Sequence, residues 1–152
     1  MSPQCGDVEE LNDEEVLWRR VQDHLDHLTW DSDAQCWRPR PTHPSNALQF
    51  DPDLSTTWER HLTTVHALTP EAVLDESGKY TLVYALSVGD ARGLDCGVRH
   101  SPVESTPPLC AHASLDWPEP VDRNAKREIR YGLSQVMTLI FGAPSVTPPP
   151  GA

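Results

Sequence analysis

The sequence lacks long apolar runs and has few basic residues. Its longest apolar stretch, Val136 to Phe141, is too short to cross a bilayer, and the N-terminus shows neither the basic nor the apolar part of a signal peptide. The chain has 12 Lys and Arg residues against 23 Asp and Glu residues, so its net charge is -11. Such a chain repels phosphate backbones and anionic lipids. We therefore expect no nucleic-acid partner, no membrane association and a cytoplasmic location.

Several motifs that carry chemistry are also missing. The sequence contains no glycine-rich phosphate loop, no dinucleotide-binding fingerprint and no Gly-x-Ser-x-Gly segment. Its cysteines, Cys5, Cys36, Cys96 and Cys110, form no Cys-x-x-Cys pair of the kind that structural zinc sites use. These absences exclude the common nucleotide enzymes and predict no cofactor and no metal. In a cytoplasmic protein the four cysteines should be reduced.

Two assemblies of reactive side chains remain open. Cys110 and His112 are two residues apart in a predicted strand, so they face the same side and could bind zinc with Cys96 and His100, or make Cys110 a nucleophile. A serine, a histidine and an acid could also form a hydrolytic triad. Its members would be Ser45 or Ser55, His112, and Asp90 or Asp116.

The apolar pattern predicts two long helices. Asn12 can cap a helix over about 13–28, where apolar residues recur at spacings of 4, 4 and 3, and Asp122 can cap another over about 121–141. Strands are predicted over 54–58, 80–86, 96–100 and 109–117, with short helices after Thr69 and Ser87. This order predicts an α+β fold, in which a small, largely antiparallel sheet is packed by the N-terminal and C-terminal helices.

Composition divides the chain into three parts. Residues 1–11 are acidic and predicted to be disordered, residues 12–142 form a single domain, and the proline-rich tail over 143–152 is predicted to be flexible. Within the domain, residues 29–53 form a long connection that contains several of the chain's 15 prolines. Long connections in compact domains are usually functional or flexible.

Aromatic residues surround this connection. Trp30, Trp37, Phe50 and Trp58 lie within or beside it, and tryptophan is enriched at protein interfaces. We therefore predict a non-enzymatic interaction or accessory protein that binds a protein partner through the loop over 30–58. The aromatic residues could instead close a small core of their own.

Two further predictions concern polar residues. A pocket that gathers Arg19, Ser45, Ser55 and His112 would suit a small anionic ligand, as a binding domain or an enzyme. Separately, Arg123, Lys126, Arg127 and Arg130 form a basic cluster on the predicted C-terminal helix. Such a cluster is typical of a solvated helix face, and it can also form a patch for an anion or a partner.

The order of several short segments resembles a group of small bacterial proteins, frequent in actinobacteria, that have no assigned activity. The segments are Glu-Val-Leu-Trp-Arg-Arg (15–20), Pro-Ser-Asn-Ala-Leu-Gln-Phe (44–50), Leu-Ser (54–55), Leu-Ser-Val-Gly-Asp-Ala-Arg-Gly-Leu (86–94), Val-Arg-His-Ser-Pro (98–102) and Ala-His-Ala (111–113). The resemblance implies a single cytoplasmic bacterial domain. It also marks six positions that match the group pattern: Arg19, Ser45, Phe50, Ser55, Pro102 and His112.

Overall fold

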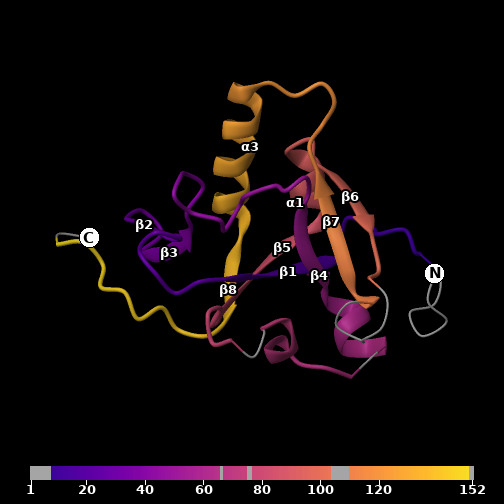
Figure 1. Cartoon of the computed structure of the whole chain (residues 1–152), viewed down its shortest axis with the longest axis horizontal. Coiled ribbons are helices and arrows are strands. Elements are labelled where there is room, and N and C mark those ends of the chain that lie inside the picture. Colours follow the sequence, from indigo (N-terminus) through magenta and orange to yellow (C-terminus); the bar gives the residue numbers. More distant parts are fainter. Residues whose placement is uncertain (1–7, 66, 75–76, 104–109, 151–152) are drawn as a thin grey trace.

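A six-stranded antiparallel sheet forms the centre of the protein (Figure 1). The computed structural model describes residues 8–65, 67–74, 77–103 and 110–150. The strand order across the sheet is β6-β7-β4-β1-β5-β8, and every adjacent pair is antiparallel. The strands are β1 (Val16–Val21), β4 (Leu54–Trp58), β5 (Leu82–Ser87), β6 (Gly97–His100), β7 (His112–Asp116) and β8 (Thr138–Phe141). The predicted α+β class with an antiparallel sheet is confirmed.

The predicted N-terminal helix is wrong. Residues 16–21 form β1, which pairs with β4 on one side and β5 on the other, and the chain then turns into β2 (Leu28–Asp31). β1 is buried on both faces, with Leu17 and Val21 on one and Trp18 on the other. Leu25, which completes the apparent helical stripe, is 56% exposed. Pairing on both edges and burial on both faces therefore override the helical spacing.

The second predicted helix exists but ends earlier than expected. Helix α3 (Arg123–Val136) begins after Asp122, whose side chain accepts a hydrogen bond from the backbone N–H of Ala125 at 2.7 Å. Met137 is already extended, and the chain continues directly into β8, an edge strand that pairs with β5. The β-branched and aromatic residues of β8 favour a strand over another helical turn. Among the described residues, α3 is the single long helix.

The shorter elements follow the sequence more closely. Ser87 caps α1 (Val88–Gly93) by accepting a hydrogen bond from the N–H of Asp90, and a 3₁₀ turn, η2 (Pro70–Val73), follows Thr69. No sequence signal indicates the π-helical turn η1 (His61–Val65). The hairpin of β2 and β3 (Cys36–Pro39), which lies inside the long connection and forms a separate two-stranded sheet, was also not predicted.

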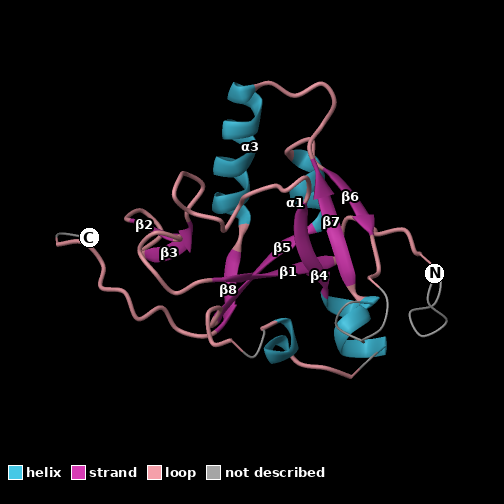
Figure 2. Cartoon of the chain, in the orientation of Figure 1, coloured by secondary structure: helices cyan, strands magenta, loops and turns pink. Residues whose placement is uncertain are grey.

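The sheet separates two clusters of buried side chains. Figure 2 shows helix α3 on one side of the strands and the helical turns η1 and η2 on the other. The larger cluster joins β1, β4 and β5 to α3 through Ile129, Leu133 and Met137, and it also includes Leu48 of the long connection. The smaller cluster contains Trp18 and Leu62, beneath η1 and η2. The long connection and α3 therefore lie on the same side of the sheet.

The segments that flank the domain on both sides contact it. The backbone N–H of Glu9 donates to His100 Nδ1 at 3.1 Å, and that of Ser145 donates to Asp23 Oδ2 at 2.8 Å. Val146 packs against the larger core cluster. Disorder over 1–11 and flexibility over 143–152 stay predictions, and residues 1–7 lie outside the described residues.

Leu133→Ala tests the contact between α3 and the sheet. Leu133 is fully buried, so we expect truncation to lower the free energy of unfolding by about 2–5 kcal/mol through lost transfer energy and a residual cavity. Leu25→Ala is the matched control, because Leu25 is exposed and should change stability by less than about 0.5 kcal/mol. Urea denaturation measures both, and equal losses would contradict the placement of α3.

Candidate functional site

Arg19 ties the long connection to the central sheet. From β1, its Nη1 donates to the carbonyl of Ser55 at 2.7 Å and its Nη2 to the carbonyl of Asn46 at 3.0 Å, while Nε donates to the carbonyl of Ala47. Burial lowers the pKa of Arg19 to about 10, so the side chain stays charged at neutral pH. The guanidinium group thus uses three of its donors to fix the backbone of residues 46–47 against β4.

Ser45 stabilises the same segment of the connection that Arg19 holds. Its hydroxyl accepts a hydrogen bond from the backbone N–H of Ala47 at 3.0 Å, which is the usual role of serine in a turn. The following residues Ala47 and Leu48 are buried in the core. Phe50 stacks on Trp117, with 3.7 Å between the ring centroids, and closes the loop at its far end.

His112 lies on the opposite face of the sheet from Arg19. It is paired with Thr57, and Thr57 with Trp18, so His112 shares the face of Trp18, whereas Arg19 is one residue further along β1. His112 Nδ1 is 2.9 Å from Ser101 Oγ, which is 2.7 Å from Ser114 Oγ. Arg19 therefore contacts the backbone of Ser55, whereas His112 contacts Ser101, which in turn contacts Ser114.

The predicted triad is not assembled either. Ser55 is exposed and lies opposite Ser114 in the register of β4 and β7. Asp116 binds Arg99, with Arg99 Nε at 2.8 Å from Asp116 Oδ2, and His112 Nδ1 also contacts the carbonyl of Ser101 at 3.0 Å. His112 and Ser101 form a hydrogen-bonded pair, but neither candidate acid contacts the histidine among the described interactions: Asp116 binds Arg99, and Asp90 lies in the first turn of α1.

The four predicted aromatic residues have different positions. Trp58 is fully buried in the core and cannot contact a partner. Trp30 and Trp37 face each other across the β2–β3 hairpin as an edge-to-face pair, with 5.3 Å between the ring centroids, and both are half-buried. Phe50 is half-buried against Trp117. The aromatic residues therefore mainly shape the connection and leave part of Trp30 and Trp37 accessible.

The hairpin is fastened to the C-terminal end of α3. Arg38 forms an ion pair with Asp31 at 2.6 Å and donates to the backbone carbonyl of Gln135 at 3.1 Å. Ser134 donates its hydroxyl proton to the carbonyl of Pro39 at 2.6 Å, and Tyr84 donates to the carbonyl of Trp37 at 2.9 Å. These bonds hold the hairpin beside α3 and define the walls of a groove.

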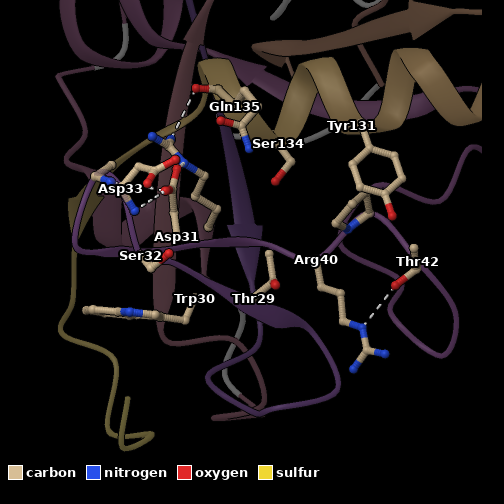
Figure 3. Close-up of a pocket in the computed structure, with 13 residues that line it drawn as sticks. Thr29, Trp30, Asp31, Ser32, Asp33, Arg40, Thr42, Tyr131, Ser134 and Gln135 are labelled. Carbon is tan, nitrogen blue, oxygen red and sulfur yellow. Dashed lines mark hydrogen bonds and ion pairs between the residues drawn. The ribbon is translucent and has the colours of Figure 1, made fainter. Parts of the chain in front are cut away.

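Two adjoining cavities run along α3, and we call them together the α3 groove. One cavity of about 420 Å³ lies between α3 and the Thr29–Ala34 turn, as Figure 3 shows, and the other, of about 570 Å³, lies between α3 and residues 41–49. They share Pro41, Thr42 and Tyr131 as lining residues. Tyr131, Ser134 and Gln135 point from α3 toward the hairpin and the Arg40 side chain in Figure 3.

Charge is unevenly distributed along the α3 groove. Arg123, Arg127 and Arg130 line the part beside residues 41–49, without an acid among its lining residues. The part beside the hairpin is mixed in charge, because Asp31 and Asp33 line it together with Arg38 and Arg40. The arginines recur at i, i+4 and i+7, so they lie on one stripe of the helix. This spacing is visible in the sequence, but no sequence signal places the stripe opposite the Pro-Ser segment or identifies Tyr131, Arg40 and Asp33 as its neighbours.

The cysteines do not form a reactive site. Cys36 and Cys96 are free thiols, and burial raises the pKa of the Cys96 thiol to about 11, which disfavours the reactive thiolate. Cys110 is disulfide-bonded, so the expectation that all four cysteines are reduced fails there; Cys5 lies outside the described residues. Within the described ranges, no group of three His, Cys, Asp or Glu side chains could hold a metal ion, and no helix could span a membrane.

Comparison with protein-family models, with curated proteins and with solved structures gives no match to this chain.

Replacing Arg19 tests its role as a tie. Arg19→Met removes three donors and leaves three backbone carbonyls without them, so we expect the free energy of unfolding to fall by about 3 kcal/mol. Arg19→Lys should recover only part of this, because one ammonium group cannot span three acceptors. Arg92→Met is the control, since its ion pair with Asp13 is exposed and worth less than about 1 kcal/mol. Urea denaturation is the measurement, and wild-type stability of Arg19→Lys would refute the role.

His112 should make the fold sensitive to acid. Burial lowers the folded-state pKa of His112, so between that value and the unfolded value near 6.5 the unfolded chain binds more protons. Stability from the neutral ring is complete above about pH 6.5 and is lost progressively below it. We expect His112→Gln to reduce the loss of stability between neutral and mildly acidic pH, and NMR titration of the ring to give a pKa below 6.5. A ring that titrates above this value would contradict the prediction.

Proposed function

We propose that this protein is a cytoplasmic interaction or accessory protein that binds a segment of a protein partner in the α3 groove. The observation that carries the proposal is the groove itself, which is walled by the aromatic, proline-rich connection on one side and by an exposed stripe of α3 on the other. Its walls are fixed by Arg19, Arg38 and Ser134. A preformed groove reduces the ordering cost of binding.

The composition of the walls favours protein recognition. Tyr131 is 44% exposed and lies at the junction of the two cavities, and Trp30 lines the hairpin end. Tyrosine, tryptophan and arginine are the residues that most often dominate the energy of protein interfaces. The groove therefore combines aromatic contact area with several charged groups, in agreement with the predicted use of the loop over 30–58.

Catalysis is less well supported by the same observations. The reactive polar groups singled out in the sequence are mostly engaged in internal bonds: Arg19 with carbonyls, Ser45 with Ala47, and His112 with Ser101. A membership of the bacterial group that the ordered segments resemble is part of this proposal. Under this membership, related chains that share the Pro-Ser segment would have the same groove wall, because this segment lines the groove.

Site-specific photo-crosslinking in the source organism tests the proposal. A benzophenone amino acid at Gln49 or Tyr131, both on the groove wall, should yield one discrete crosslinked protein, whereas the same group at exposed Asp90 on α1 should not. The captured protein, once identified and purified, should reproduce the crosslink at Tyr131. Equal labelling from Asp90, or no crosslink from either groove position, would rule out binding in the groove.

A further inference from the structure

The arginines of the α3 groove differ from most others in the chain. Arg38, Arg60, Arg92 and Arg99 each form an ion pair with an Asp or Glu side chain. Arg38 itself lines the hairpin end of the groove. Within the part of the chain that the structure describes, the other groove arginines have no carboxylate at ion-pair distance; they are Arg40, Arg123, Arg127 and Arg130. A chain with 23 acidic residues against 12 basic ones thus places four guanidinium groups without an ion pair along one groove.

Two arginines of this stripe contact aromatic rings of the chain itself. Arg130 lies over the Trp117 ring at 5.3 Å and Arg127 lies near the Tyr131 ring at 5.9 Å, so the aromatic rings orient both guanidinium groups. Neither guanidinium group donates a hydrogen bond to another residue that the structure describes, so the N–H donors of both remain available. The groove therefore presents pre-positioned donors that suit carboxylate or phosphate oxygens.

We infer that the occupant of the groove is an extended acidic segment of the partner, with acidic side chains at alternate positions over the arginine stripe; this rests on the proposed function. One helical turn separates Arg123 from Arg127, a rise of about 6 Å. In an extended chain, side chains two residues apart lie on one side at about 6.6 Å. The two spacings match, so successive acidic side chains reach successive guanidinium groups.

The other end of the groove sets the direction of the segment. Asp33 is exposed there, and within the described residues it has no ion-pair partner. From Arg123 to Gln135 the helix rises by about 18 Å, which is the length of five or six extended residues. The lining beside residues 41–49 is cationic and the lining at the hairpin end is mixed in charge, so the segment carries its acids at the end beside residues 41–49, and a basic residue at the other end can pair with Asp33.

An NMR titration with short peptides tests the inference. The probe is the capped peptide Asp-Thr-Asp-Thr-Val-Lys, and the comparisons are its charge-swapped form Lys-Thr-Lys-Thr-Val-Asp and its isomer with adjacent acids, Asp-Asp-Thr-Thr-Val-Lys. We expect backbone shifts confined to α3 and residues 41–49, and binding at least tenfold weaker for the charge-swapped form. The isomer should bind at least threefold more weakly, because its acids point to opposite sides.

Two variants with the same change in net charge separate the groove from the overall field. Arg127 is exposed, and its side chain contacts the Tyr131 ring alone among the described residues, so Arg127→Glu should keep the fold and weaken the binding of the probe at least tenfold. Lys79→Glu, on an exposed turn, should weaken it less than twofold. Equal effects of the two variants, or equal binding of the charge-swapped peptide, would overturn the inference.

The failure of this inference is distinguishable from failure of the proposed function. If Tyr131 still crosslinks one partner in cells while the probe shows no preference for acidic peptides, the groove binds a partner of other chemistry and the inference is wrong. A six-nucleotide thymidine oligomer bound more tightly than the probe would overturn it in favour of nucleic acid. Loss of the partner crosslink in Arg127→Glu, with retention in Lys79→Glu, would support it in the full chain.

Discussion

The guanidinium group of Arg19 is the interaction on which the arrangement of the groove depends. It lies on β1, in the middle of the sheet, and it holds the carbonyls of residues 46 and 47 from one side and of Ser55 from the other. Backbone carbonyls in a connection between strands need partners when they are buried. By supplying them from one rigid strand, Arg19 allows a proline-rich segment without regular structure to pack at a fixed position.

The groove follows from this tie together with the bonds at the end of α3. Arg38 and Ser134 join the hairpin to the last turn of the helix, while Arg19 and Leu48 hold the segment that faces its first turns. The connection is therefore attached at both ends of α3 but not along its exposed stripe. The space that remains is lined mainly by polar and charged side chains that lie outside the core, such as Arg123, Arg127 and Tyr131.

The extent to which the sequence predicted this structure differs between local and nonlocal features. Elements set by local chemistry were predicted well, such as the Ser87 cap of α1, the Asp122 cap of α3 and the β5 strand. β1 was predicted wrongly as a helix, because its pairing with β4 and β5 overrides the helical spacing of its apolar residues. The predicted helix over 121–141 was too long, because its last residues form β8 and pair with β5. Both errors come from partners distant in sequence, which a local pattern cannot include.

The candidate site was predicted in the same partial way. Arg19 and Ser45 belong to one region and support the connection, whereas His112 lies across the sheet from them. The basic stripe of α3 was visible as a pattern of charges, yet its value depends on what it faces. In solvent, Arg123 and Arg127 would be ordinary surface cations that increase solubility. Opposite a fixed wall, with Tyr131 between the two cavities and Asp33 at the far end, the same residues give the groove a charge polarity that can select both the chemistry and the direction of a bound chain.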